Sequence, residues 1–349
     1  MIVSRTPFRI SLFGGGTDYP TWYEENGGAV IGTTINKYCY ISIRSLPPFF
    51  EHRHRIVYSR IELPNTVEEI DHPAVRAVLK EHGVTEGVEI QHHGDLPARS
   101  GMGSSSSFTV GLLNAVRAFQ GHVSSPEWLA NEAIRIEQDV IQEHVGSQDQ
   151  VWASYGGTNL ITFHPDGRIH VGPIVMSPER REELESHLLL FFTGFSRIAD
   201  NIAKQKIRNL RSHGRELESM IGMVHEAAGV LQNPGRPLLQ IGTMLAEAWK
   251  MKRELADCVS NGDVDAMYEA ARDAGAIGGK LLGAGGGGFM LLFAEPPAQV
   301  RIREALRGRI EVPFRVGSPG SSIVIYEPDG LERKHAPRAH ERLAAVGRS

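Results

Sequence analysis

The fold is decided by a glycine- and serine-rich stretch, Leu96-Pro97-Ala98-Arg99-Ser100-Gly101-Met102-Gly103-Ser104-Ser105-Ser106-Ser107. This stretch stands directly before a helical period that runs from Ser104 to Phe119. Glycines let the backbone approach a ligand, and the free N–H groups and dipole of a first helical turn attract anions. The stretch predicts an anion site, and the structural alternative is a polar loop with a serine as helix cap. It lacks the Gly-Lys-Ser/Thr of the Walker A loop.

A second glycine run, Gly283-Ala284-Gly285-Gly286-Gly287-Gly288, has GxGxxG spacing and raises the hypothesis of a dinucleotide-dependent dehydrogenase. That fingerprint follows a strand, opens a helix and has an acidic residue about 20 positions later. Here the run precedes an apolar strand, Phe289 to Phe293, near the end of the sequence. This context disfavours a dehydrogenase.

A third glycine run ends the strand Phe8 to Phe13, in the order Gly14-Gly15-Gly16-Thr17-Asp18. It either brings a ligand close to the backbone or forms a tight turn in which Asp18 caps the next helix. Two separate carboxylates, Glu137 and Asp149, could divide the tasks of holding Mg²⁺ and orienting an attacking hydroxyl group. Neither identifies an enzyme alone, because isolated acidic residues are usually solvated or capping groups.

The remaining pattern predicts an α+β chain of two domains, residues 1–172 and 173–329, followed by a basic tail, 330–349. In the first domain we expect strands at Tyr38–Arg44 and Val88–His92, a helix at Pro73–His82, a helix at Pro126–His144 capped by Ser124 or Ser125, and a hairpin of Asn159–Phe163 with Arg168–Val171. In the second we expect strands at Leu188–Phe192, Phe289–Phe293 and Ser322–Tyr326, and helical stretches at Ile198–Leu231 and Leu238–Val259.

The composition restricts the class of protein. The chain has 349 residues, 41% of them hydrophobic and 22% charged, and its formal net charge is −4, so no global field favours nucleic acid. No run of residues is apolar enough for a membrane span, and no apolar signal precedes the first strand, which predicts a cytoplasmic protein. The sequence has two cysteines, Cys39 and Cys258, and we expect both to be ordinary thiols without a disulfide or metal. None of the 15 histidines has the HExxH spacing of a zinc site.

Taken together, the three glycine segments resemble the GHMP kinase superfamily in order and approximate spacing. The matching motifs are Pro7 to Tyr19, Pro97 to Ser107 and Lys280 to Phe289, and the resemblance spans Val3 to Tyr326. It implies an N-terminal ribosomal-S5-like α/β domain and a C-terminal α+β GHMP domain. It also implies that ATP and Mg²⁺ bind between them.

The resemblance assigns roles to individual residues. The triphosphate would lie on the ATP-binding loop, which comprises Gly101, Met102, Gly103, Ser104, Ser105, Ser106 and Ser107. Magnesium would be held by Ser104 or Ser105 together with Glu137. Asp149 would orient or deprotonate the attacking hydroxyl group, and Arg9 would offset the developing charge.

The substrate expectation rests on the same resemblance. Gly15-Gly16 stand where galactokinase has a Glu-His pair, and the string Phe13 to Asp18 is similar to heptose 7-phosphate kinases and to the related fucokinases. The compact length and Thr193 to Arg197 favour the heptose branch. The implied reaction phosphorylates the anomeric hydroxyl of D-glycero-D-manno-heptose 7-phosphate to heptose 1,7-bisphosphate, for nucleotide-activated heptose. The expected substrate-binding residues are Gly15, Gly16, Thr17, Asp18, Arg197, Gly285 and Gly286.

Two other readings of the family stay open at this point, a fucokinase-like sugar kinase and a regulator that binds sugar and ATP without turnover. The presence of Asp149, Glu137 and Arg9 together with the serine loop disfavours the regulator. The expected partners are ATP and a small sugar phosphate, with neither nucleic acid nor membrane. A homodimer is left open.

Overall fold

The computed structural model describes residues 1–194, 213–254 and 259–328. Four features of the sequence prediction lie outside this range: Arg197, Cys258, the start of the helical stretch predicted from Ile198, and the tail 330–349. None of the helices in the described part of the chain is both long and apolar enough to cross a membrane.

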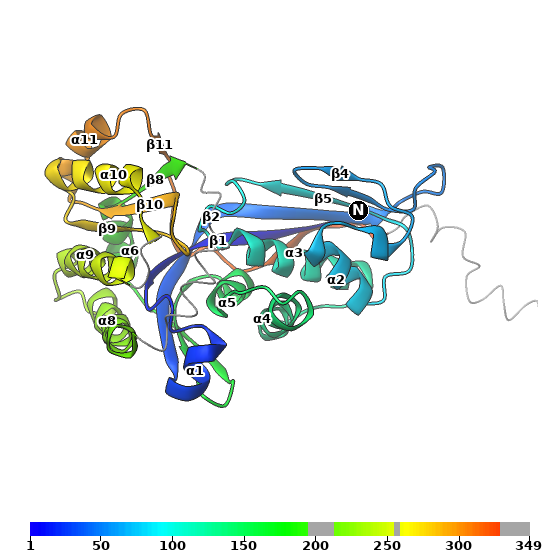
Figure 1. Ribbon diagram of the computed structural model, residues 1–349, viewed down its shortest axis with the longest axis horizontal. Coiled ribbons are helices and arrows are strands. Elements are labelled where there is room, and N and C mark those ends of the chain that lie inside the picture. The colour runs from blue at the N-terminus through cyan, green and yellow to red at the C-terminus, as the bar shows by residue number, and fades with distance from the viewer. Residues whose placement is uncertain (195–212, 255–258, 329–349) are drawn as a thin grey trace, which may run out of the picture.

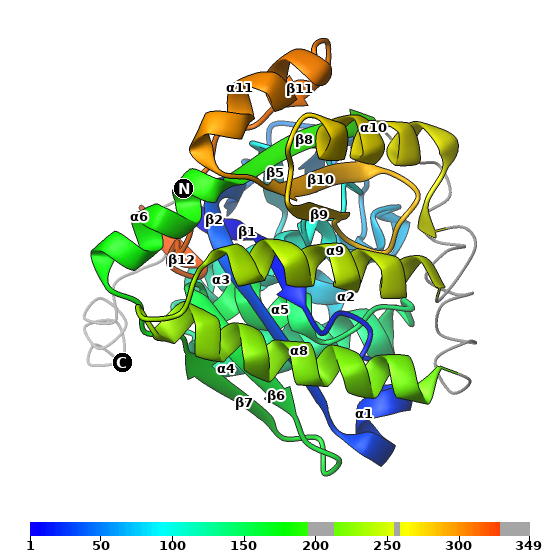
Figure 2. The ribbon, with the colours of Figure 1, turned by 90° about the vertical axis from the view of Figure 1, so that its left-hand side faces the viewer.

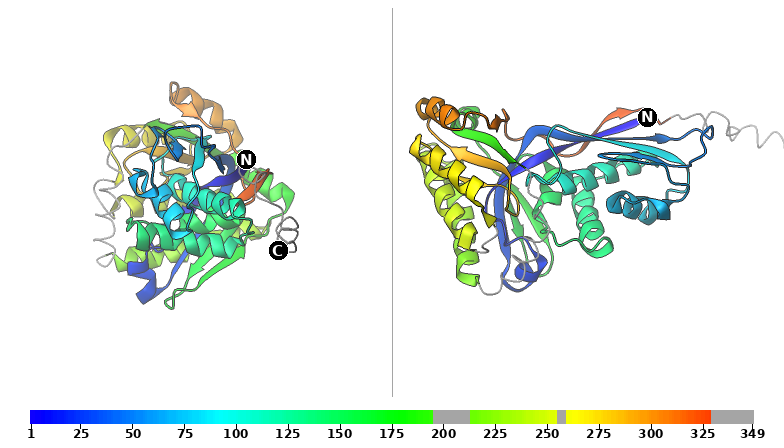
Figure 3. Two further views of the ribbon diagram at one scale, coloured as in Figure 1. Left: turned by 90° about the vertical axis from the view of Figure 1, so that its right-hand side faces the viewer. Right: turned by 45° about the horizontal axis from the view of Figure 1, so that its top comes forward.

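The first layer is a large sheet built around two long strands, β1 (Ile2–Phe13) and β2 (Gly28–Ser45), which pair antiparallel. Side chains of β1 alternate between buried and half-buried up to Arg5 and are all buried from Thr6 onward. The strand therefore has one face open to solvent at its start and both faces covered where it approaches the site. The right-hand view of Figure 3 shows both strands, in blue, running from one end of the molecule toward the other.

In the part of the chain that the structure describes, this sheet has eight strands, with the path β12-β1-β2-β5-β3-β4 and with β6 pairing β2 and β7. The other strands are β3 (Arg55–Val57), β4 (Ile61–Glu62), β5 (Val88–Gly94), β6 (Thr158–Phe163), β7 (Ile169–Pro173) and β12 (Ser322–Tyr326). Helices α2 (Pro73–Glu81), α3 (Ser104–Phe119), α4 (Pro126–Arg135) and α5 (Gln148–Tyr155) cover one face, as Figure 1 shows. A short helix, α1 (Pro20–Asn26), joins β1 to β2.

The second sheet has four strands among the described residues, in the order β11-β8-β10-β9. Its strands are β8 (Leu188–Gly194), β9 (Gly278–Leu281), β10 (Gly288–Phe293) and β11 (Ile310–Glu311). The helices are α6 (Pro178–His187), α8 (Gly214–Gln232), α9 (Leu239–Glu254), α10 (Gly262–Asp273) and α11 (Pro296–Ala305). Figure 2 shows α8 and α9 side by side below this sheet.

The structure corrects the sequence prediction in two places. Ser322–Tyr326 is a strand, but it pairs with β1 in the first sheet, so it does not belong to the second domain as predicted. A strand pattern fixes the side chains that face inward but not the partner strand. The predicted helix Pro126–His144 is capped by Ser125 but ends as an α-helix at Arg135, and a π-helical turn, Ile136–Val140, follows.

Candidate active site

The glycine-serine stretch forms a loop that leads directly into α3. Arg99, Gly101 and Gly103 have positive φ angles of 58°, 80° and 75°, and the residues between them do not. Turns of this kind can direct backbone N–H groups toward one side, as in an anion site. Gly103 is the N-cap of α3 and carries no side-chain cap, so the first turn keeps its N–H groups for a ligand. The predicted helix start at Ser104 is confirmed.

The serines that follow have different surroundings. Ser104 Oγ accepts a hydrogen bond from the backbone N–H of Arg99 at 3.0 Å, which closes the loop. Ser107 Oγ donates to the carbonyl oxygen of Pro7 at 2.9 Å, and Met102 is fully buried. Ser105 is exposed at the start of the helix. The Ser107 and Met102 side chains therefore hold the loop in place, and the backbone groups remain the part that faces a ligand.

The glycine run between β9 and β10 packs against this loop. A Cβ atom on Gly101 would lie 2.5 Å from the carbonyl oxygen of Leu282, and one on Gly288 would lie 2.2 Å from that of Ser100. Lys252 holds the run by donating to the carbonyl oxygens of Leu281 and Gly283. Because the run connects two antiparallel strands and opens no helix, it is not a Rossmann fingerprint, and the dehydrogenase hypothesis fails.

Arg9 and Asp149 form an ion pair directly beneath the loop. Arg9 Nε and Nη2 donate to the two carboxylate oxygens of Asp149 at 2.7 and 2.6 Å, and Nη1 donates to the carbonyl oxygen of Gly101 at 2.7 Å. The Arg9 side chain is 6% exposed and that of Asp149 is 24% exposed. A fork-to-fork pair of this kind fixes the carboxylate in direction as well as in charge. The carboxylate consequently keeps a defined position with one side open to solvent.

Gly103 fits closely over this pair. A Cβ atom at this position would lie 3.1 Å from Arg9 Cγ and 3.5 Å from Asp149 Cγ. The backbone N–H of Arg9 also donates to the carbonyl oxygen of Met102 at 3.1 Å. The start of α3, the ion pair and the end of β1 are thus one connected unit.

Glu137 is buried under the same helix start, in the π-helical turn. Its Oε2 atom accepts hydrogen bonds from Ser106 Oγ at 2.9 Å and from Gln150 Nε2. Its Oε1 atom is buried and has no hydrogen-bond partner within the described residues. Burial raises the pKa of Glu137 to about 7. The serine in contact with Glu137 is Ser106, which follows the two serines predicted as magnesium ligands, Ser104 and Ser105.

The glycine turn after β1 is anchored by Thr17, which is fully buried. Its hydroxyl oxygen lies 2.9 Å from the carbonyl oxygens of Gly14 and Ala29, which share its one hydrogen, and it accepts from the N–H of Ala29 at 3.1 Å. The Thr17 side chain is thus used to hold the turn against β2, and the structure gives it no open side for the sugar contact predicted from sequence.

Asp18 lies inside the same turn and is 1% exposed. Its Oδ1 atom accepts from the N–H of Gly16 at 2.9 Å, and a Cβ atom on Gly146 would lie 1.9 Å from its Oδ2 atom. The backbone of Asp18 accepts from the N–H of Ser147 at 2.9 Å. Because the N-cap of α1 is Tyr19 without a side-chain cap, the reading of Asp18 as a helix cap is wrong. Asp18 instead joins the glycine turn to the loop that leads into α5, the helix that carries Asp149.

The other residues predicted to bind the sugar lie in different parts of the structure. Gly15 lies beside this turn, next to Ser11 and Gln148. Gly285 and Gly286 lie against Val259, whose carbonyl oxygen accepts from the N–H of Gly286 at 2.9 Å. Arg197 lies outside the described residues. The sugar contacts predicted for Gly15, Gly16, Gly285 and Gly286 stay predictions.

Sequence reasoning missed several side chains at the site. Tyr19 lies close to both carboxylates, and burial together with Asp18 and Asp149 raises its pKa, so the phenol keeps its proton. Gln150 binds Glu137, and Ser11 Oγ donates to Gln148 Oε1 at 2.8 Å. Gln148 and Gln150 flank Asp149 in the sequence, which is the signal that could have found them.

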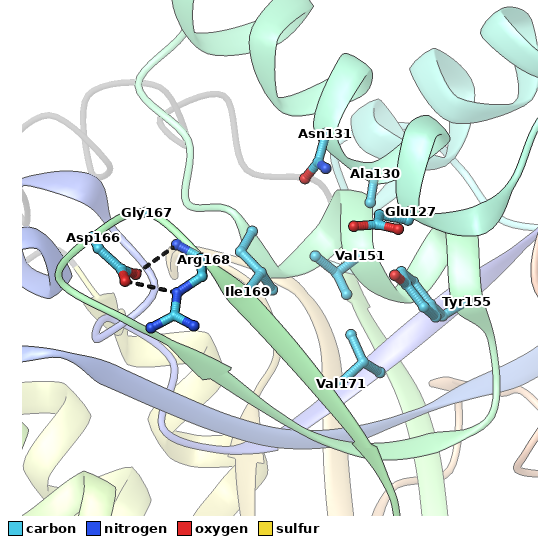
Figure 4. Close-up of a pocket in the computed structure, with 10 residues that line it drawn as sticks. All are labelled: Glu127, Ala130, Asn131, Val151, Tyr155, Asp166, Gly167, Arg168, Ile169 and Val171. Carbon is cyan, nitrogen blue, oxygen red and sulfur yellow. Dashed lines mark hydrogen bonds and ion pairs between the residues drawn. The ribbon is translucent and has the colours of Figure 1, made fainter.

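Two cavities lie away from this unit. One of about 420 Å³ lies between α4, the far end of α5 and the β6–β7 hairpin, and Figure 4 shows its rim residues Glu127, Asp166 and Arg168. Asp166 pairs with Arg168 across the hairpin turn, so these charges satisfy each other. A second cavity of about 400 Å³ lies at the opposite end of the large sheet, beside Met1 and Glu327. Neither is lined by the residues of the site.

Comparison with known proteins agrees with this geometry. The sequence models of the GHMP kinases N terminal domain and of the GHMP kinases C terminal domain match residues 65–157 and 236–311. A D-glycero-alpha-D-manno-heptose 7-phosphate kinase of Campylobacter jejuni is 29% identical over 318 residues, 88% of this chain and 93% of that protein. A bifunctional fucokinase/GDP-fucose pyrophosphorylase of Arabidopsis thaliana is 27% identical over 89% of this chain, which spans 31% of that longer protein.

Solved structures share the fold. A D-glycero-D-manno-heptose 1-phosphate kinase from Bacteroides thetaiotaomicron superimposes with a TM-score of 0.77 at 23% identity, covering 94% of this chain and 100% of that one. Lactococcus lactis galactokinase in complex with galactose superimposes with a TM-score of 0.71 at 17% identity, covering 92% and 94%. Fold and site together define a two-domain small-molecule kinase without a Walker loop. The chain thus has the two-domain GHMP kinase fold, with matches to the family's N-terminal and C-terminal domains in the same order.

Proposed function

We propose that this chain, an ATP-dependent sugar kinase of the GHMP superfamily, transfers the γ-phosphoryl group of ATP to the anomeric hydroxyl of D-glycero-D-manno-heptose 7-phosphate. The product would be heptose 1,7-bisphosphate, an intermediate toward nucleotide-activated heptose, made in the cytoplasm. The support for the substrate is the heptose 7-phosphate kinase of Campylobacter jejuni, which matches over nearly the whole of both chains.

The observation that carries the proposal is the Arg9–Asp149 pair beneath the uncapped start of α3. Phosphoryl transfer requires that the acceptor hydroxyl and the phosphate chain meet in line, with charge stabilised around the transferring group. The loop and helix start donate N–H groups to the phosphates, and Asp149 accepts a hydrogen bond, and then the proton, from the hydroxyl. Arg9 holds the carboxylate in that direction and contributes positive charge.

The site also fits a magnesium ion bound together with the nucleotide. The fitting observation is the buried Oε1 atom of Glu137, which lacks a protein partner within the described part of the chain. Magnesium prefers oxygen ligands and is commonly held by one or two carboxylates plus substrate phosphates. We propose that Glu137 holds it, with Ser104 or Ser105 as predicted, and that Ser106 and Gln150 fix the carboxylate. When bound, the ion would neutralise charge on the phosphate oxygens.

The sugar would lie between Asp149 and the glycine turn. Gly15 carries no side chain beside Gln148 and Ser11, and Asp18 is held against Gly146 on the other side of the turn. The placement of Asp18 as a sugar ligand remains part of the proposal, because its Oδ1 atom already accepts from Gly16. All of these residues come from one chain, so a homodimer is not required for the proposed site.

A fucokinase-like activity is the second candidate. It is favoured by the bifunctional fucokinase relative, whose match covers 89% of this chain at 27% identity. The same machinery would serve either sugar, because both carry an anomeric hydroxyl. A regulator without turnover is disfavoured by the bidentate Arg9–Asp149 pair, which a binding protein would not need.

A substrate panel separates these candidates. The full chain is assayed with ATP and Mg²⁺ on heptose 7-phosphate, heptose 1-phosphate, sedoheptulose 7-phosphate, fucose, galactose and mevalonate, and phosphorus NMR locates the new phosphate. We expect the highest kcat/KM with heptose 7-phosphate and phosphorylation at the anomeric oxygen. A higher kcat/KM with fucose would favour the fucokinase-like activity. Binding of sugar and ATP without turnover of any acceptor would favour the regulator.

A further inference from the structure

Two neighbouring side chains of β1 each hold one of two consecutive residues of α5. Arg9 and Ser11 are two positions apart, so they project from the same face of the strand. Arg9 binds Asp149, and Ser11 Oγ donates to Oε1 of Gln148 at 2.8 Å. The strand thus fixes Gln148 in the same way as it fixes the proposed catalytic carboxylate.

In this contact the amide oxygen of Gln148 is the end that is occupied. With Oε1 on the Ser11 hydroxyl, the Nε2 group is turned toward the glycine turn, because a Cβ atom on Gly15 would lie 3.7 Å from Nε2 and 3.7 Å from Ser11 Oγ. Nε2 makes no hydrogen bond of its own among residues 1–194, 213–254 and 259–328. Ser11 is buried and Gln148 is half-buried. An anchored pair of N–H donors therefore stands beside Gly15, at the glycine turn.

We infer that Gln148 is a specificity-determining residue whose Nε2 group donates to the sugar oxygens on either side of the attacking hydroxyl, namely the ring oxygen and the 2-hydroxyl. The inference rests on the proposed function, because it takes a sugar bound at Asp149. An amide donor cannot take up the proton, so this role is separate from that of Asp149. An acceptor whose reacting carbon has no neighbouring oxygen leaves the donors unpaired, which favours carbohydrates over simple alcohols.

Ser11 is a positioning residue in this account, since it acts only through Gln148. Its hydroxyl donates to Oε1 and so anchors the amide beside β1, in the orientation that leaves Nε2 for the sugar. Loss of the hydroxyl should therefore weaken sugar binding less than loss of the amide does. Loss of both should cost little more than loss of the amide alone, because the two side chains act as one unit.

The test compares Gln148→Met, Ser11→Ala and the double variant with wild type. Gln148→Met keeps an unbranched side chain of similar length without the donors, and Gln120→Met, whose amide binds the carbonyl oxygen of His82 outside the site, is the matched control. We expect Gln148→Met to raise the sugar KM about tenfold with an unchanged calorimetric affinity for ATP. Ser11→Ala should raise it less, and Gln120→Met should change neither constant.

The result separates this inference from the proposed function. Whichever sugar of the panel wild type phosphorylates best is used, so a change of substrate leaves the comparison intact. An unchanged sugar KM in folded Gln148→Met, or an equal fall in ATP affinity, would overturn the inference while the kinase assignment stands. If wild type phosphorylates no acceptor, the proposed function fails. Calorimetric sugar binding to wild type and Gln148→Met then decides the inference, with equal affinities overturning it.

Discussion

Replacing Gly103 by alanine tests whether the loop, the ion pair and the nucleotide site form one unit. Gly103 has a φ of 75°, and an alanine in that region costs about 1 to 2 kcal/mol of stability. The new Cβ atom would lie 3.1 Å from Arg9 Cγ and 3.5 Å from Asp149 Cγ. Carbon atoms prefer separations of about 3.5 to 4.0 Å, so Arg9 must move by a few tenths of an ångström and turn the Asp149 carboxylate with it.

Gly121 provides a matched control on the same helix. It lies just beyond the end of α3 with a φ of 83°, and an added Cβ atom there would meet no atom within 4 Å. Urea denaturation should show a loss of about 1 to 2 kcal/mol for both Gly103→Ala and Gly121→Ala. Steady-state kinetics should show a fall in kcat of about tenfold or more for Gly103→Ala alone, because small displacements of reacting groups cost up to about 100-fold. Equal kcat values for the two variants would refute the coupling of the loop to the ion pair.

Three further predictions follow from the site. The pKa of Glu137 is raised from 4.5 to about 7, so the folded protein binds this proton more tightly than the unfolded chain, and metal-free stability should fall as pH rises from about 4.5 to about 7. Glu137→Gln should lack this decline of roughly 3 kcal/mol in pH-dependent denaturation, and a decline equal to that of wild type would contradict the burial argument. Gly146→Ala should displace Asp18 and raise the sugar KM without changing the affinity for ATP. The control Gly222→Ala, in open space on α8, should leave the sugar KM unchanged. An unchanged sugar KM in Gly146→Ala would show that Asp18 is not part of the sugar site. Arg9→Lys keeps the charge but loses the bidentate geometry, so kcat should fall although the protein folds, and wild-type kcat would show that the charge alone suffices.

The sequence predicted local elements better than their partners. The helix from Ser104 to Phe119 was predicted correctly because its period and the glycines before it are local signals. The strand Ser322–Tyr326 was also predicted, but its pairing with β1 was not, since an alternating pattern carries no information on the neighbouring strand.

The site required long-range information that spacing cannot supply. Arg9 and Asp149 lie 140 positions apart in the sequence, and only the family resemblance suggested that they meet. The sequence predicts a regular helix at Glu137, but the structure has a π-helical turn there, which directs Glu137 toward Ser106. Such a turn has no sequence pattern that distinguishes it from an α-helix. The burial of Thr17 could not be predicted either, because a threonine in a glycine turn resembles a ligand-facing residue in sequence.

The central claim is that Asp149 acts on the acceptor hydroxyl. Asp149→Asn keeps the volume of the side chain but removes the proton acceptor, and its direct test is kcat measured together with calorimetric affinities for ATP and for sugar. The account predicts a fall in kcat of about 10²- to 10⁴-fold with both affinities nearly unchanged. Near-normal kcat in the folded variant would contradict the account, as would a loss of nucleotide affinity that matches the loss of kcat.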